Sequence, residues 1–273
     1  MLRSMYSGVS GMRGFQTKLD VIGNNIANVN TIGFKAGRVM FRDILSQSVA
    51  GVTAPVDGES GGVNAKQIGL GVSIAAIDTL HTPGSAMTTN KPTDLRIDGD
   101  GFFVVSPTGE VDGSFLTRDG NFKLDGARQL VTADGLFVLD AGGGPIVLED
   151  TVTAFTIAQN GTIIAVNIDG TTEATEFQIG MTKVVNPDAL EKLGGNLYRV
   201  TPNANPEGEF DIGTAQDPET GTGSIISGQL EMSNVDLTSE FTEMIIAQRG
   251  FQANSRIITT SDEVLQEVVN LKR

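Results

Sequence analysis

The chain has 273 residues and a formal net charge of −14, with one histidine and no cysteine. Nucleic acid and anionic membranes both require a basic face on their protein partner, so this charge argues against either as a partner. The lack of cysteine excludes disulfides and thiolate metal sites, and the apolar runs are too short to predict a membrane-spanning segment or a cleaved signal peptide.

The first predicted element is an amphipathic helix at the N-terminus. Its apolar face follows a three-four spacing at Leu2, Met5, Val9, Met12, Leu19 and Ile26. Asparagines follow, which compete for local backbone hydrogen bonds and are poor helix-interior residues: Asn24, Asn25, Asn28 and Asn30. We therefore expect the helix to end here, in a turn closed by Gly33.

Three glycines weaken this helix. Gly8, Gly11 and Gly14 recur at every third position, and each costs up to about 1 kcal/mol of helix stability relative to alanine. One interpretation is a frayed chain end. The interpretation we prefer is that both chain ends are disordered in the monomer and fold on assembly, where glycines permit close approach between helices.

The segment 43–90 is rich in glycine and is predicted to be an extended linker. Within it, residues 46–66 show no sustained period and are expected to form an extended or loosely ordered loop. A loop of this length inside a compact domain would be unusual unless it lies against neighbouring subunits. Residues 69–77 alternate in polarity and predict a short strand.

Residues 91–200 are predicted to form an all-β domain. Short apolar runs are separated by Asp-Gly and Asn-Gly pairs, which supply the positive-φ positions of tight hairpins. This spacing favours a sandwich or an irregular barrel. Residues 188–193 fit a single helical turn, and residues 201–230, rich in Pro, Gly, Asp and Thr, fit a return linker.

The last predicted element is a long helix with a seven-residue apolar repeat. The repeat comprises Leu237, Met244, Phe251, Ile258 and Leu265, and its companion positions are Phe241, Gln248, Ser255, Asp262 and Val269. Residues 1–42 carry six bases and one acid, whereas residues 231–273 carry seven acids and four bases. The two helices are therefore complementary in charge and are predicted to pair, although scattered solvated charges would give the same count.

Catalytic and ligand-binding patterns are weak. His81 is the only histidine, and the Thr-Pro-Gly sequence beside it favours a surface loop over a catalytic triad. Asp98 and Asp100 resemble part of a calcium loop but lack its further ligands, so paired turns are preferred. The glycine runs at 142–144 and 221–223 lack the spacing of phosphate loops. We expect no catalytic residue, cofactor or metal.

Four motifs resemble a known family. NNIANVNTIGFK at residues 24–35 resembles the N-terminal signature of bacterial flagellar rod and hook proteins, and SNVDL at 233–237 with AQRGFQANS at 247–255 resembles the C-terminal one. GDGFF at 99–103 and TRDGNF at 117–122 resemble middle-domain motifs. The first and last residues look most like the short hook proteins of Gram-positive bacteria, with the distal rod protein as the alternative. In the distal rod, a stretch like 46–66 is associated with a stiff, straight tube.

Taken together, these patterns predict an α+β fold. Residues 1–42 and 231–273 would form a discontinuous, coiled-coil-like helical core domain, residues 43–90 and 201–230 extended linkers, and residues 91–200 an inserted all-β outer domain. The predicted assembly interface comprises Leu2, Met5, Val9, Met12, Leu19, Asn24, Asn25, Ile26, Asn28, Asn30, Gly33 and Phe34, together with Leu237, Phe241, Met244, Phe251, Ile258, Leu265 and Val269.

The resemblance implies a structural, non-enzymatic subunit that polymerises into the hook tube, a flexible joint that passes motor torque to the filament. The distal rod is the alternative, and a secreted adhesin or binding module is a candidate from another class. The implied partners are copies of the chain itself, the adjoining axial proteins of the rod, hook cap and hook-filament junction, and the flagellar type III export apparatus. The implied location is the flagellum, outside the cytoplasmic membrane.

Overall fold

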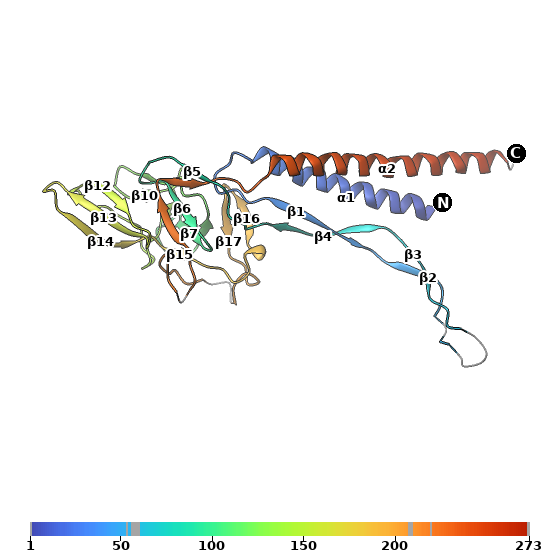
Figure 1. Cartoon of the computed structure of the whole chain (residues 1–273), viewed down its shortest axis with the longest axis horizontal. Coiled ribbons are helices and arrows are strands. Elements are labelled where there is room, and N and C mark those ends of the chain that lie inside the picture. Colours follow the sequence, from blue (N-terminus) through green and yellow to red (C-terminus); the bar gives the residue numbers. More distant parts are fainter. Residues whose placement is uncertain (1, 53, 56–60, 207–209, 219, 272–273) are drawn as a thin grey trace. The chain divides into compact units, whose positions relative to one another are not determined.

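The computed structural model describes residues 2–52, 54–55, 61–206, 210–218 and 220–271. These residues fold into two compact units (Figure 1). The helical unit comprises Met1–Ala27, Gly37–Thr79 and Asp236–Arg273, and the β unit comprises Asn28–Ala36 and Leu80–Val235. Each unit is therefore built from segments that are far apart in the sequence.

The helical unit contains both predicted helices, α1 (Leu2–Ala27) and α2 (Leu237–Asn270). The Asp236 side chain accepts a hydrogen bond from the Thr238 amide at 3.0 Å, so it caps an otherwise unpaired N–H at the start of α2. The predicted end of α1 at the asparagine-rich sequence is confirmed, and Gly33 has the expected positive φ of 69°.

The helical unit also contains a long antiparallel ribbon, in which β1 (Gly37–Asp43) pairs with β4 (Val72–Thr79) and β2 (Ser46–Ala50) pairs with β3 (Lys66–Gly69). The predicted strand at 69–77 is confirmed in its greater part by β4. The expectation of a loosely ordered loop is wrong for β2 and for Lys66, where it overlaps β3. Because β2 and β3 are exposed on both faces, no apolar alternation marks them in the sequence.

The β unit is built on one large antiparallel sheet in the order β16-β17-β8-β7-β11-β10-β9, with β15 pairing with β7. Its strands are β7 (Phe102–Ser106), β8 (Phe115–Thr117), β9 (Lys123–Leu124), β10 (Leu130–Val131), β11 (Phe137–Val138), β15 (Met181–Thr182), β16 (Glu191–Gly194) and β17 (Leu197–Arg199). Side chains on its two faces belong to two apolar clusters, one around Phe103 and Phe122 and one around Phe102 and Leu116.

Smaller sheets complete the β unit. A three-stranded sheet joins β12 (Val152–Ile157), β13 (Thr162–Asn167) and β14 (Thr172–Gln178). Two strand pairs join residues before and after the large sheet: β18 (Ser224–Ser227) with β6 (Leu95–Asp98), and β19 (Gln229–Glu231) with β5 (Ala86–Thr88). Both pairs connect segments more than a hundred residues apart.

The end of the predicted return linker is part of this core. Ile225 is fully buried in the cluster around Phe103, because β18 completes a sheet whose other strand lies more than a hundred residues earlier. The helical turn expected at 188–193 is a short 3-10 helix at Pro187–Ala189, and the chain then continues as β16. Asparagine at 186 and proline at 187 favour the turn, whereas pairing with β17 extends the residues after it.

Candidate assembly surface

The two helices of the helical unit contact each other in antiparallel fashion (Figure 1). Lys18 of α1 donates to Glu243 of α2 at 2.5 Å, and nearer the N-terminus Ser4 and Ser261 approach to 3.5 Å. Residue numbers of the partners therefore sum to about 265 along the contact. The predicted pairing of the two end helices is seen here within one chain, although the lysine-glutamate pair is partly exposed and contributes little on its own.

Glycines of α1 let its neighbours approach closely. A Cβ at Gly11 would lie 2.9 Å from the Asn254 amide nitrogen of α2, and one at Gly14 would lie 2.7 Å from the Phe41 ring of β1. Gly8 faces Ile258 of α2 at 3.3 Å. The close approach of helices that the three glycines predict is therefore present, with α2 at two of them and with the ribbon at the third.

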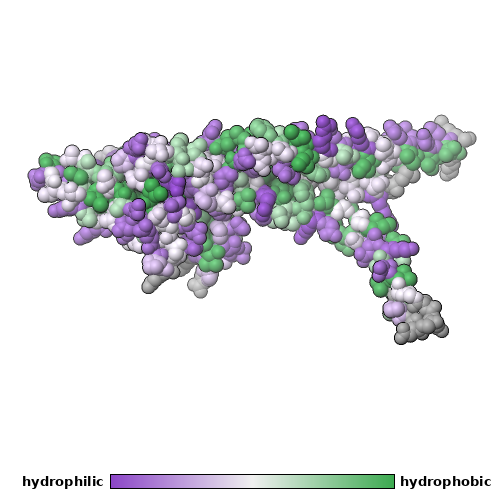
Figure 2. Space-filling model, viewed as in Figure 1, coloured by the Kyte–Doolittle hydropathy of each residue, from purple (hydrophilic) through white to green (hydrophobic). Residues whose placement is uncertain are grey.

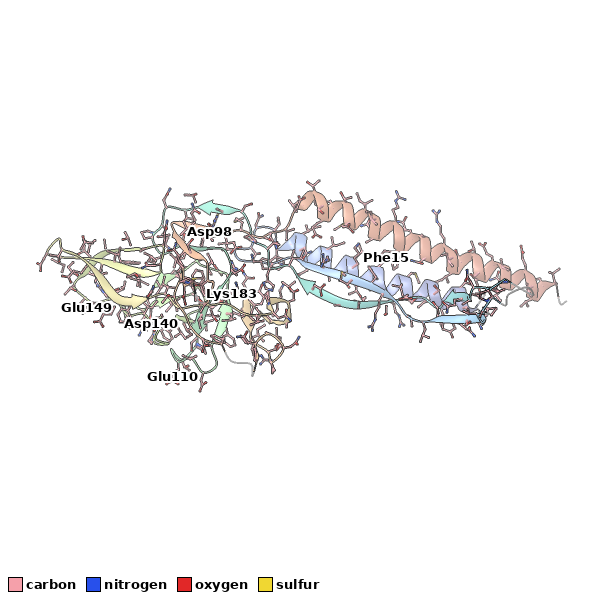
Figure 3. All side chains as sticks on the ribbon, turned by 60° about the horizontal axis from the view of Figure 1, so that its bottom comes forward. Phe15, Asp98, Glu110, Asp140, Glu149 and Lys183 are labelled. Carbon is pink, nitrogen blue, oxygen red and sulfur yellow. The ribbon has the colours of Figure 1, made fainter. Side chains whose placement is uncertain are left out.

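Phe15 occupies the centre of this contact (Figure 3). Its ring meets Phe41 of β1 at a centroid separation of 5.8 Å, and a Cβ on Gly250 of α2 would lie 2.6 Å from the same ring. One aromatic side chain thus packs against both α2 and the ribbon. The glycine of the Arg-Gly-Phe sequence at 249–251 is needed because a ring lies directly on the helix backbone.

Asn25 joins the end of α1 to the ribbon and to α2. Its buried amide donates to the Gly37 carbonyl at 2.8 Å and accepts from the Gly37 amide at 2.9 Å, so it pairs with the backbone as a strand would. The same amide donates to Glu240 at 3.0 Å. Burial raises the pKa of the Glu240 carboxyl above its ordinary value, against the effect of this hydrogen bond.

The predicted assembly residues fall into distinct environments. Those that are partly buried within their own unit are Met5, Val9, Met12, Leu19, Ile26, Asn28, Met244, Ile258 and Leu265. Three are buried: Asn25, Gly33 and Phe34. Those that are exposed are Asn24, Asn30, Leu237, Phe241, Phe251 and Val269. The side chain of Leu2 lies outside the described residues. Of the predicted residues, Ile258 lies against Gly8 of α1, and Asn25 donates to Glu240 of α2.

A second apolar stripe on α2 was not identified from the sequence. It comprises Ile246, Ile257, Val264 and Val268, which are 52%, 44%, 44% and 51% exposed, and we call it the outer stripe. At 100° per residue these four positions fall within an arc of about 40°, roughly a quarter turn away from the residues that face α1. Their spacing of eleven, seven and four residues is a helical period that the sequence does contain. In the described part of α2, Ala247 alone is buried.

The ribbon exposes large apolar side chains as well. Leu45, Val49, Ile68 and Ile77 are all exposed, and apolar patches lie along the ribbon and along α2 in Figure 2. A two-stranded ribbon is marginally stable in water by itself. The exposed apolar residues of the ribbon and of α2 are therefore candidate interaction surfaces.

Comparisons with known proteins assign the chain. Residues 5–35 match the family described as "Flagella basal body rod protein", residues 96–165 match "Flagellar hook protein FlgE/F/G D1 domain", and residues 226–271 match "Flagellar basal body rod FlgEFG protein C-terminal". The chain is 54% identical to the flagellar basal-body rod protein FlgG of Bacillus subtilis over 273 residues, covering all of both chains. The chain belongs to the flagellar rod and hook family.

Two further relatives span the same family. The basal-body rod protein FlgG of Borreliella burgdorferi is 38% identical over 279 aligned residues, and the hook protein FlgE of the same organism is 29% identical over 451 aligned residues, with full coverage of both chains in each case. Rod and hook proteins of this family are structural components of the flagellum that assemble as polymers with the other axial proteins. They are not enzymes.

Members of this family need no reactive centre, and the single histidine has none of the features of one. His81 is not on a surface loop as expected: its ring packs between Phe102 and Tyr198 at centroid distances of 5.6 and 5.5 Å, since the segment after β4 passes along the large sheet of the β unit. Burial lowers the pKa of His81 to about 4, assisted by the positive charges of Lys35, Arg118 and Lys192.

The Asp-Gly-Asp-Gly sequence does not form the paired turns that we expected, because Asp98 ends β6 and a bend follows at 99–100; both carboxylates form ion pairs. Asp98 binds Arg96 at 2.7 Å and Asp100 lies 3.2 Å from Lys183. Among the described residues, no group of three or more His, Asp or Glu side chains is arranged to hold a metal ion. Neither helix of the described chain is apolar enough along a sufficient length to cross a membrane.

Proposed function

We propose that this chain is a subunit of the distal rod, the straight drive shaft of the flagellar basal body, rather than of the hook. The observation that carries this proposal is the full-length match at 54% identity to a basal-body rod protein of the same length. The hook relatives need alignments of 451 and 473 positions, so they contain long segments that this chain lacks. The terminal motifs, which first favoured the hook, occur in both branches of the family.

The ribbon supports the rod over the hook. Its strands include residues 46–50 and Lys66 of the 46–66 stretch, whose counterpart in the distal rod is associated with a stiff tube. Part of that stretch pairs in register, Ser46 opposite Gly69 and Gln47 opposite Ile68, and it exposes apolar side chains on a structure too thin to bury them itself. An arm of this kind, seated on neighbouring subunits, would oppose the sliding between subunits that a bending joint requires.

Assembly proceeds through the end helices in this proposal. The contact between α1 and α2 uses one face of α2 and leaves the outer stripe exposed together with Phe241 and Phe251. These residues are proposed to pack against other subunits in a coiled-coil-like core, with head-to-tail contacts that do not close into a ring. The β unit forms the outer layer of the tube.

The remaining partners follow from this position. The subunit contacts the neighbouring axial proteins below and above it, and it reaches the growing end through the flagellar type III export apparatus. The surface of the β unit carries separate acidic residues such as Glu110, Asp140 and Glu149 (Figure 3).

Complementation distinguishes rod from hook. The chain is expressed in two strains of Bacillus subtilis, one lacking its rod protein FlgG and one lacking its hook protein, with each native gene restored in the same way as a positive control. We expect swimming to return in the strain without the rod protein and not in the strain without the hook protein. Rescue of the hook-deficient strain alone would overturn the assignment.

A further inference from the structure

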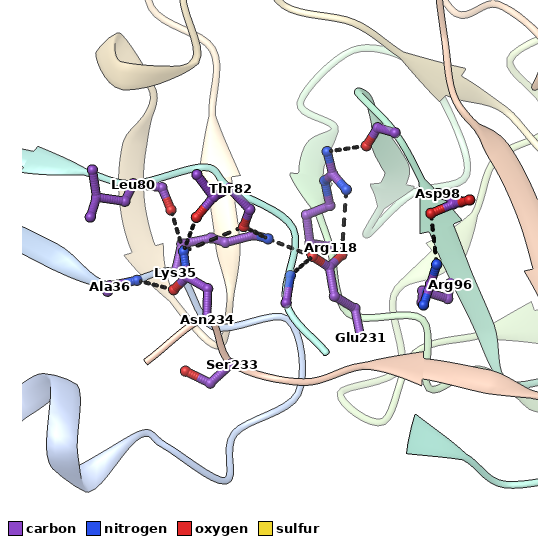
Figure 4. Close-up of polar contacts among 12 residues, drawn as sticks. Lys35, Ala36, Leu80, Thr82, Arg96, Asp98, Arg118, Glu231, Ser233 and Asn234 are labelled. Atoms are coloured by element: carbon purple, nitrogen blue, oxygen red, sulfur yellow. Dashed lines mark hydrogen bonds and ion pairs between the residues drawn. The ribbon is translucent and has the colours of Figure 1, made fainter. Parts of the chain in front are cut away.

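Three distant segments of the β unit meet at one buried group of charges (Figure 4). The Glu231 carboxylate accepts from Lys35 Nζ at 2.5 Å and lies 3.4 Å from Arg118 Nη1. The side chains of Lys35, Glu231 and Arg118 are 0%, 1% and 4% exposed. Lys35 and Arg118 come from the N-terminal and middle motifs, and Glu231 lies two residues before the C-terminal motif; we call these three residues the ion triad.

The glutamate is the only acid in the triad, so it neutralises two buried cations. Lys35 also donates to the Thr82 carbonyl at 2.8 Å, and Arg118 donates to the Gly99 carbonyl at 3.0 Å. Burial lowers the pKa of Lys35 and of Arg118, and the charge of Glu231 opposes both shifts. Without the carboxylate, closing the β core would bury two charges with no acid in the triad to neutralise them, leaving backbone carbonyls and, for Arg118, the Phe102 ring, which is strongly unfavourable.

Residues 231–234 also form hydrogen bonds with two segments that come early in the chain, 33–36 and 80–84. The Glu231 carbonyl accepts from the Gly33 amide at 2.8 Å, and its carboxylate accepts from the Gly84 amide at 2.9 Å. Three residues later, the Asn234 side chain accepts from the Ala36 amide at 2.8 Å and donates to the Leu80 carbonyl at 2.8 Å. The segment that carries Glu231 therefore closes the N-terminal segment of the β unit onto the rest.

From these contacts we infer that the ion triad is a folding lock: the β unit reaches its folded state only when the segment around Glu231 joins those that carry Lys35 and Arg118. A chain whose residues beyond about 223 are not yet available lacks both the carboxylate and the strands β18 and β19. It would have to bury two unpaired cations and leave β5 and β6 without partners. Such a chain stays unfolded.

This lock would suit a protein that crosses a narrow channel before it folds. An incomplete chain would remain in a form that the channel accepts, and folding would begin only as the last fifth of the chain arrives. This consequence rests on the proposed function, whereas the lock itself rests on the contacts of the β unit. The two are therefore tested by different measurements.

Refolding kinetics of the full-length chain test the lock. Glu231→Gln keeps the size of the side chain and removes its charge, and folding is followed by the fluorescence of buried Tyr198 in a Tyr6→Phe background. Glu191→Gln is the matched control, because Glu191 forms an exposed ion pair with Arg199 in the same unit. We expect Glu231→Gln to slow refolding about 100-fold, with little change in the unfolding rate, and Glu191→Gln to change neither rate by more than about threefold.

A normal refolding rate combined with a faster unfolding rate in Glu231→Gln would overturn the lock, because the β unit would then fold before the triad forms. If Glu231→Gln fails to fold at all, the triple variant Lys35→Met, Arg118→Met, Glu231→Leu keeps the inference testable. It removes all three charges at once, so it should fold, and without slowing. A triple variant that also fails to fold would contradict the role assigned to the charges.

Discussion

At the scale of single residues, the glycines of the helical unit differ in how closely other side chains approach them. Gly250 lies beneath the Phe15 ring, and a Cβ there would lie 2.6 Å from that ring, whereas Gly23 of α1 has no atom within 4 Å of the same position. Both glycines lie in helices, and in a helix alanine is more stabilising than glycine by up to about 1 kcal/mol. The surroundings, and not the helix propensity, should therefore decide the sign of each substitution.

We predict that Gly250→Ala lowers the stability of the helical unit by about 1–3 kcal/mol, because Phe15 is also held by Phe41 and cannot move away freely. Gly23→Ala, as the matched control, should raise stability by up to about 1 kcal/mol. Urea unfolding followed by the helical circular dichroism signal measures both. Stabilisation by Gly250→Ala would show that the ring does not lie on this backbone.

His81 predicts a pH dependence of the β unit. Its pKa is lowered to about 4 in the folded chain, from an ordinary value of 6.5. Between these values the unfolded chain binds a proton that the folded chain does not, so the free energy of unfolding should fall as the pH falls from 6.5 to 4, by at most about 3 kcal/mol. Above pH 6.5 the histidine is neutral in both states and contributes no slope.

His81→Phe isolates this contribution from the carboxylates that titrate at the lower end of the same range. Phenylalanine keeps the ring contacts with Phe102 and Tyr198. The difference in unfolding free energy between the variant and the natural chain should grow as the pH falls from 6.5 to 4 and should be constant above 6.5. A difference that does not change with pH would mean that neither burial nor the neighbouring cations lower the pKa of His81.

At the scale of elements, α2 carries two apolar stripes with separate tasks. Ile258 lies against Gly8 of α1, whereas the residues of the outer stripe are exposed. We predict that Ile257→Glu abolishes assembly while leaving the monomer folded, because it places a charge on the proposed subunit contact only. Sedimentation of the assembled material, with circular dichroism of the soluble chain, measures both effects.

Gln252→Glu is the control for this substitution, since Gln252 is exposed on another face of the same helix. It should assemble normally. Assembly of Ile257→Glu at the normal rate would remove the outer stripe from the subunit contact, and loss of helix in the soluble variant would show that the stripe serves the monomer instead.

Much of this architecture was predictable from the sequence, because the two helices and most central strands have a clear period. The expected positive φ is confirmed at most of the Asp-Gly and Asn-Gly pairs, among them Gly113, Gly135 and Gly161, but it is wrong at Gly120 and Gly126. What could not be predicted were elements defined by distant partners. The ribbon strands β2 and β3 have no apolar face, and β18 and β19 are too short to show alternation.

The candidate assembly surface was likewise only partly predictable from the sequence. In the seven-residue repeat of α2, Ile258 lies against Gly8 of α1, whereas Leu237 and Phe251 are exposed like the outer stripe. Sequence period alone cannot tell which of two stripes is used within the chain. Likewise Lys35, Arg118 and Glu231 each lie within or beside a recognised motif, but only the fold reveals that they form one buried group.

At the scale of the whole molecule, the two units should differ greatly in stability. The β unit has two apolar clusters of fully buried side chains, whereas the described part of α2 buries Ala247 alone and α1 contains three glycines at its contacts. We predict that in the monomer the amides of α1 and α2 exchange with solvent at least about 100-fold faster than those of β7 and β13. Hydrogen exchange by mass spectrometry measures this directly.

The same measurement on assembled material supplies the comparison. Protection of the two helices should rise on assembly, because covering the outer stripe stabilises α2 and the contact with α1. Strong protection of residues 2–27 in the monomer would contradict the view that the chain ends gain their order from assembly.

The central claim is that the chain builds a straight tube through its end helices. Electron microscopy of the purified full-length chain, concentrated in the presence of native basal-body fragments as seeds, tests it most directly. We predict straight tubes from the natural chain and none from Ile257→Glu. Curved tubes from the natural chain would contradict the rod assignment and return the hook to first place, and tubes from both chains would contradict the assembly surface on α2.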